Sequence, residues 1–116
     1  MTFGDIEKDA RLLVLDTYED AYRFQPAEIY SAIVKAVVNT RKVRPESCYV
    51  NGMLVEFTRR DVNDDITNIT IEMEDSWREA LVYHVAHQLY MKDDPDTQNL
   101  NLSKEYFNRY TTTVMT

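Results

Sequence analysis

Two histidines in the second half of the chain have a spacing with which a helix can hold a metal ion. His84 and His87 lie three residues apart in an apolar stretch, and residues at i and i+3 share one face of a helix. No third ligand follows at helical spacing, because Glu79 lies five residues before His84 and Gln88 is a poor metal ligand. A small metal enzyme is therefore one hypothesis. We favour the alternative that both imidazoles pack against neighbouring helices.

Acidic residues form three groups that have the composition of a carboxylate dyad or a calcium loop. The groups are Asp64 with Asp65, then Glu72, Glu74 and Asp75, and finally Asp93, Asp94 and Asp96. A calcium-binding loop needs Gly at its sixth position and Glu at its twelfth, which counted from Asp93 are Gln98 and Lys104. Turns and helix caps explain the acids better. We predict no catalytic residue, no cofactor and no metal, and hence no enzyme.

The charge and composition of the chain argue against two classes of function, sequence-specific DNA binding and membrane insertion. With 116 residues and 44% hydrophobic content, the chain fits one domain with its own core. Residues 1–44 carry seven acids and seven bases, whereas residues 45–75 carry eight acids and two bases. No basic face is available for sequence-specific DNA binding, and no apolar run approaches the roughly 20 residues of a membrane helix. The lone Cys48 and the absence of an export signal suit the cytosol.

Apolar spacing and capping residues predict about four helices. A first helix is expected near residues 5–16 with Asp5 as its cap, and a second from Pro26 until Pro45 ends it. Asp75 or Ser76 should cap a third, central helix. The last amphipathic helix falls within residues 97–116, where the run of three Thr residues at 111–113 should fray or stay extended.

The segment between the second and third helices has the composition of a small sheet. Residues 47–71 are rich in strand formers, and Asn51-Gly52 is a tight-turn pair. Ile69 and Ile71 alternate with polar residues as in a half-buried strand, and residues 59–65 form a polar tip. The predicted fold is therefore mainly α, a small helical bundle with a short antiparallel hairpin or meander inserted between its second and third helices.

Aromatic residues exceed what one small core can enclose, since the chain has eight Tyr, four Phe and one Trp. Four of them are assigned to the core, namely Tyr30, Phe57, Trp77 and Tyr83. Phe107 and Tyr110 lie on a narrow apolar stripe of the last helix, and such a stripe favours contact with another chain.

Two stretches resemble the head-to-tail adaptor (connector) proteins of tailed bacteriophages. The first is LLVLDTYEDAYRFQPAEIYSAIVKAVVNTRKVRPES, with a helix, an aromatic-containing break, a capped helix start and a closing Arg-Pro. The second is DSWREALVYHVAHQLYMKDDPDTQNLNLSKEYFNRY, with a Trp-led helix, a Lys-Asp-rich turn and a final aromatic helix. Together they span roughly two-thirds of the chain, and residues 47–74 match no pattern of the family.

The resemblance implies a structural virion protein that is assembled in the host cytoplasm and located at the head–tail junction. It implies a ring of copies, usually twelve in this family, beneath the portal protein, which extends the DNA channel and receives tail, nozzle or stopper proteins. The C-terminal helix and tail, residues 97–116 of a single adaptor-like domain, would dock on the portal through Phe107, Tyr110, Val114 and Met115. The alternative is a small acidic cytosolic regulatory module that binds one partner.

The acidic middle segment has two interpretations. Asp61, Asp64 and Asp65 could face the lumen of a ring and repel the phosphates of genomic DNA, which would pass transiently without sequence-specific binding. The same acids could instead face a basic neighbour.

Overall fold

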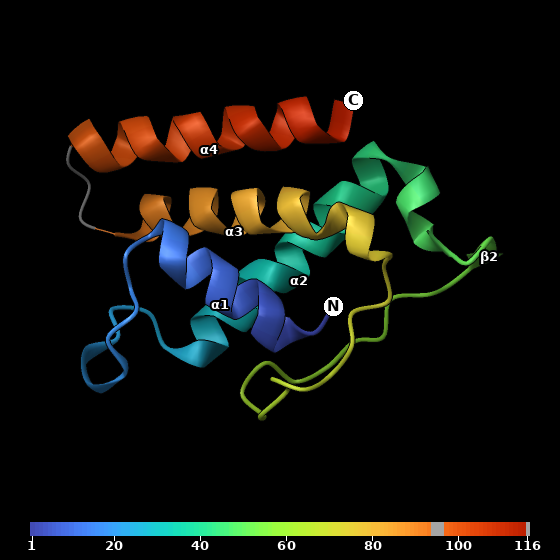
Figure 1. The fold of residues 1–116 in the computed structure, drawn as a ribbon, viewed down its shortest axis with the longest axis horizontal. Coiled ribbons are helices and arrows are strands. Elements are labelled where there is room, and N and C mark those ends of the chain that lie inside the picture. Colours follow the sequence, from blue (N-terminus) through green and yellow to red (C-terminus); the bar gives the residue numbers. More distant parts are fainter. Residues whose placement is uncertain (94–96, 116) are drawn as a thin grey trace.

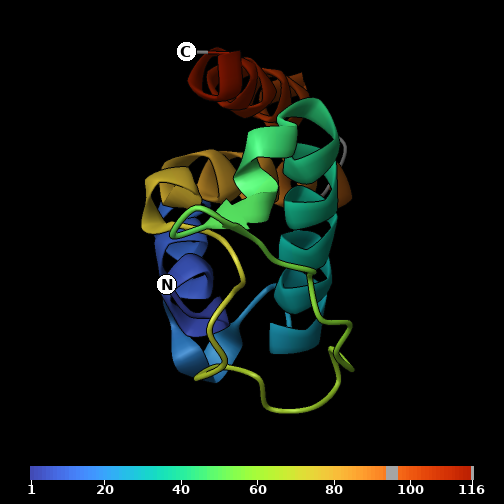
Figure 2. The same ribbon diagram turned by 90° about the vertical axis from the view of Figure 1, so that its right-hand side faces the viewer.

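A computed structural model describes residues 1–93 and 97–115 as a bundle in which one helix lies between the others. Its four α-helices are α1 (Phe3–Leu13), α2 (Pro26–Val43), α3 (Arg78–Lys92) and α4 (Thr97–Met115). Figures 1 and 2 show α4 on one side of α3, with α1 and α2 on the other. The predicted mainly α fold with a short antiparallel hairpin after the second helix is confirmed.

The first helix begins two residues earlier than predicted. Thr2 is its N-cap and accepts a hydrogen bond from the Asp5 backbone N–H, while the Asp5 carboxylate accepts one from the Thr2 N–H. Asp5 is thus the third helical residue of a capping box and not the cap itself. The helix ends at Leu13 and not near residue 16, because Leu15 adopts a left-handed conformation with φ of 57°.

The two prolines that were predicted to bound the second helix do so. Pro26 occupies its first position, where the missing N–H costs no hydrogen bond, and Glu28 bonds back to the Gln25 N–H. Val43 is the last helical residue, since the backbone before Pro45 is disfavoured from helical geometry.

The predicted sheet is confirmed only as a minimal hairpin. β1 (Tyr49–Val50) pairs antiparallel with β2 (Met53–Leu54) across Asn51-Gly52, whose φ angles are both positive as this turn requires. The polar stretch at 59–65 is a loop rather than a hairpin tip. Instead of a strand through Ile69 and Ile71, the structure has an isolated bridge between Thr2 and Thr70. The strand-forming side chains of residues 66–71 do not form a strand, because no neighbouring strand of the described chain lies beside them to accept and donate backbone hydrogen bonds.

The third and fourth helices differ from expectation at their ends. Glu74, and neither Asp75 nor Ser76, precedes a short 3-10 turn, η3 (Asp75–Trp77), which leads into α3. The last helix continues through the three Thr residues to Met115, which corrects the expected fraying. The hydroxyls of Thr111 and Thr113 donate hydrogen bonds to carbonyl oxygens one turn earlier, so their polar groups are hydrogen-bonded within the helix.

The main core lies between α1, α2 and α3 and includes Tyr30, as predicted. Phe57, Trp77 and Tyr83 are only partly buried, at the margins of the core. None of the helices in the described part of the chain combines the length and apolarity needed to cross a bilayer.

Candidate interaction site

The last helix carries the predicted docking residues, and the structure divides them between two faces. Tyr110 and Val114 are only 2% and 3% exposed, because they pack on Ala80 of α3 beside Trp77 and Tyr83. This burial removes both side chains from the expected docking set, since the chain's own interior already surrounds them. Sequence periodicity identified the apolar stripe correctly but could not tell which neighbour it meets.

Hydrogen bonds hold this buried stripe in place. The Tyr110 hydroxyl oxygen lies 3.0 Å from Oγ1 of Thr40 and accepts a hydrogen bond from Nδ2 of Asn39 at 2.9 Å. Arg44, at the end of α2, donates from Nε to the Val114 carbonyl oxygen. The C-terminal half of α4 is therefore attached to α2 as well as to α3, and its outer surface has a defined orientation.

The other two predicted docking residues lie on the surface. Phe107 is 42% exposed and Met115 62% exposed, and Leu100 is similarly accessible. Their spacings of seven and eight residues place all three along one side of α4, next to the buried stripe. We call Leu100, Phe107 and Met115 the outer α4 stripe. It is a row of large apolar side chains on a helix that is already anchored.

The two histidines form part of the contact between α3 and its neighbours. His84 is buried, with Nδ1 2.8 Å from Nε2 of Gln88 and its ring 4.7 Å from that of Tyr110. Burial, helped by the nearby His87, lowers the pKa of His84 to about 4, so the ring is neutral near pH 7. His87 bonds through Nδ1 to the Ser103 carbonyl oxygen of α4, 3.0 Å away.

Both histidines therefore occupy packing roles, as the favoured interpretation predicted. Within residues 1–93 and 97–115, no three His, Cys, Asp or Glu side chains converge as metal ligands would. Cys48 is a free thiol that is partly buried at the base of the hairpin.

The predicted acidic surface lies in the loop between the hairpin and η3. Asp61, Asp64 and Asp65 are all exposed. Asp61 accepts a hydrogen bond from the Asn63 N–H, and Asp65 accepts one from the Thr67 N–H, as turn aspartates do. Hydrogen bonds from Thr67 lower the pKa of Asp65, because they stabilise its carboxylate form.

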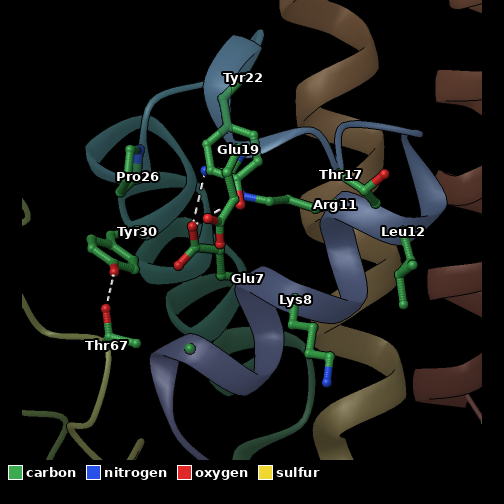
Figure 3. Close-up of a pocket in the computed structure, with 11 residues that line it drawn as sticks. Glu7, Lys8, Arg11, Leu12, Thr17, Glu19, Tyr22, Pro26, Tyr30 and Thr67 are labelled. Atoms are coloured by element: carbon green, nitrogen blue, oxygen red, sulfur yellow. Dashed lines mark hydrogen bonds and ion pairs between the residues drawn. The ribbon is translucent and has the colours of Figure 1, made fainter.

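A cavity of about 580 Å³ opens between α1 and the start of α2, and sequence reasoning did not anticipate it. Figure 3 shows the Arg11 side chain directed toward Tyr22, whose ring centroid lies 3.5 Å from the guanidinium carbon. Buried Arg11 pairs with Glu7 at 2.9 Å and with buried Asp16 at 2.8 Å. The sequence held no local signal for this pair, because Asp16 lies just beyond the end of α1.

The buried charge in the cavity has a structural role. This charge, Arg11, is neutralised by Asp16 and also donates to the Phe24 carbonyl oxygen at 3.0 Å. These bonds tie the loop after α1 to the start of α2, which is a structural role.

Comparisons of this chain with protein-family models, with curated proteins and with solved structures return no match.

Proposed function

We propose that this protein is a structural subunit of a tailed-phage virion, a head-to-tail adaptor that forms a ring beneath the portal. The observation that carries the proposal is the outer α4 stripe. Three large apolar side chains are exposed on a helix whose adjacent face is anchored to α2 and α3. Of the three, only Phe107 has a ring contact with α3, with its centroid 4.9 Å from that of His87. A preordered helix with an apolar row is suited to lie in a groove of another protein.

The order of sequence features provides further support. The two stretches that resemble adaptor proteins contain α2, α3 and most of α4, and the unmatched segment contains the hairpin and the acidic loop. A helical bundle with a small β excursion is what that resemblance implied. Under this proposal the subunit is located at the head–tail junction of the virion after assembly in the host cytoplasm.

In such a ring the acidic loop of Asp61, Asp64 and Asp65 would face either the DNA lumen or a basic neighbour. Exposed carboxylates along a channel repel phosphates and let DNA slide. Replacing all three by Asn separates the two placements. Reduced genome ejection from intact particles favours the lumen, whereas lost ring assembly favours the neighbour.

The decisive experiment mixes the purified protein with the portal protein of the same phage and images the product by negative-stain microscopy. Phe107→Ser combined with Met115→Ser should abolish portal-bound rings while lowering the Tm only modestly, because Met115 is exposed and Phe107 loses mainly its ring contact with His87, at 4.9 Å between centroids. The matched control is Lys104→Ser combined with Asn108→Ser, which changes exposed polar residues of the same helix and should leave rings intact.

A wild-type protein that stays monomeric and does not bind the portal protein would contradict the proposal. That outcome would favour the alternative, an acidic regulatory module that binds one cytosolic partner.

A further inference from the structure

The second helix is a positively charged element in an acidic protein. Residues 29–44, which form most of α2 and its C-cap, carry four bases and no acid. Because the whole chain has a net charge of −7, the other residues together carry −11. The chain therefore has one local surface that could attract an anionic partner, and its place in the fold decides which partner that is.

Contacts place α2 beside the outer α4 stripe. Nδ2 of Asn39 donates to the Tyr110 hydroxyl oxygen at 2.9 Å, and the ring of Phe107 lies one turn before that of Tyr110 with 6.2 Å between centroids. Arg44 donates to the Val114 carbonyl oxygen, which joins the end of α2 to the end of α4. Figures 1 and 2 show the last turns of α2 approaching the C-terminal part of α4.

Two lysines lie on the solvent side of α2 next to this junction. Lys35 and Lys42 are four residues before and three residues after Asn39, so all three share one side of the helix. Both lysines are exposed. Within residues 1–93 and 97–115 neither lysine forms an ion pair, so both charges remain available to a partner.

The carboxylates near this surface do not neutralise the two lysines. Glu46 pairs with Arg44 at 3.5 Å, and Glu105 pairs with Arg109 at 2.6 Å on another side of α4. Glu28, the one acid of α2, lies in the first turn at the opposite end of the helix. The surface formed by α2 and the outer α4 stripe thus combines exposed apolar side chains with unpaired positive charge.

This combination fits an acidic segment of a protein better than it fits a nucleic acid. Phe107 and Met115 are exposed apolar side chains, and phosphates offer them no apolar contact. Two lysines also displace few counterions from DNA, and the charge of −11 on the other residues repels a long polyanion. An amphipathic segment with carboxylates on one edge can cover the apolar row and reach the lysines together.

We propose that the outer α4 stripe and the two lysines of α2 bind one acidic amphipathic segment of the partner protein. Its apolar side chains cover Phe107 and Met115, and its carboxylates meet Lys35 and Lys42. The inference rests on the proposed function, in which that partner is the portal protein, and it names the chemistry that the portal segment must have.

The first test replaces the portal protein by two designed amphipathic peptides. The acidic peptide has Leu and Glu at helical spacing, and the basic peptide has Leu and Lys. Fluorescence anisotropy with the full chain should show that the acidic peptide binds at least about tenfold more tightly than the basic one. Nonspecific attraction by a protein of net charge −7 would favour the basic peptide, so the expected preference opposes the total charge.

Variants of the full chain then assign the binding to α2. Lys35→Glu combined with Lys42→Glu should raise the Kd for the acidic peptide at least about tenfold and remove most of its salt dependence. The neutral pair, Lys35→Gln with Lys42→Gln, should have an intermediate effect. The matched control is Lys8→Glu combined with Arg59→Glu, which changes the net charge equally at exposed positions elsewhere and should raise the Kd less than about threefold. Thermal melts should show all three variants folded.

Four results would overturn the inference. The wild type prefers the basic peptide, or the Lys35→Glu and Lys42→Glu variant binds the acidic peptide as tightly as the wild type. Duplex DNA displaces the acidic peptide, which would identify phosphates as the ligand. Finally, the wild type self-associates in sedimentation velocity and the same double variant does not, which would assign the surface to a second copy.

Portal binding distinguishes this inference from the proposed function. A preference for the acidic peptide that depends on the two lysines, without portal-bound rings, would refute the adaptor function alone. Portal-bound rings that form equally well with Lys35→Glu combined with Lys42→Glu would refute the acidic-segment contact alone.

Discussion

The hydroxyl oxygen of Tyr110 lies 3.0 Å from Oγ1 of Thr40, and this contact joins α4 to α2 across 70 residues of sequence. The same oxygen accepts a hydrogen bond from Asn39, and the Tyr110 ring packs on that of His84. One side chain thus connects three helices, because α3 carries His84. It also determines which face of α4 remains outside.

Tyr110→Phe should lower the free energy of unfolding by about 1–2 kcal/mol, since Thr40 is fully buried and loses a hydrogen-bond partner. Tyr110→Ala should cost about 3–5 kcal/mol because it also leaves a cavity. Urea denaturation followed by circular dichroism measures both. Phe107→Ala on the exposed side of the same helix should cost less than either, and a larger loss there would contradict the assignment of faces.

Asp16→Asn should lower the free energy of unfolding by about 3–5 kcal/mol, because it removes the buried one of the two carboxylates that pair with the buried guanidinium of Arg11 and leaves only Glu7. The carboxylate also accepts hydrogen bonds from the backbone N–H groups of Arg23 and Phe24. Urea unfolding of the variant is compared with that of Asp20→Asn, an exposed position expected to change stability by less than about 0.5 kcal/mol. Equal effects of the two substitutions would show that the Arg11 pair is unimportant.

Stability should depend on pH through His84. Its pKa is about 4 when folded and 6.5 when unconstrained, so between these values the unfolded chain binds a proton that the folded chain does not. The contribution of His84 is therefore fully favourable above about pH 6.5 and is lost as the pH falls toward 4, by up to about 3 kcal/mol. Urea unfolding at pH 7.5, 6 and 4.5 should show a smaller decline in His84→Gln than in the wild type. His87→Gln, on the same helix, should keep most of the decline.

Gly4→Ala should destabilise the protein by about 1–3 kcal/mol, because the new Cβ would lie 2.6 Å from Cγ2 of Thr67 and 2.9 Å from its carbonyl oxygen. Gly52→Ala meets no atom and should cost only about 1 kcal/mol, through its φ of +78°. Thermal melts compare the two variants. Adding Thr67→Ser to Gly4→Ala should recover only part of the loss, since the carbonyl oxygen remains. Full recovery would mean that the backbone contact is harmless.

The sequence by itself determined the features that depend on neighbouring residues. Pro26 and Pro45 bound the second helix, Asn51-Gly52 forms the hairpin turn, and amphipathic spacing predicted the four helices. These signals are local because φ restriction, capping and periodicity act within a few residues. The packing role of the two histidines could also be predicted from the sequence, because the helix that carries them has few polar residues.

Only the tertiary structure decided which surfaces remain free. Tyr110 and Phe107 belong to one amphipathic helix, yet contacts with α2 and α3 enclose the first and leave the second exposed. Apart from the isolated bridge at Thr70, the strand-forming residues after Leu54 pair with no other strand in the described part of the chain. Arg11 lies in the last turn of α1 and pairs with Asp16, which lies beyond the end of that helix. In each case the outcome depends on contacts between distant segments, whose free energies of burial and hydrogen bonding outweigh local propensity.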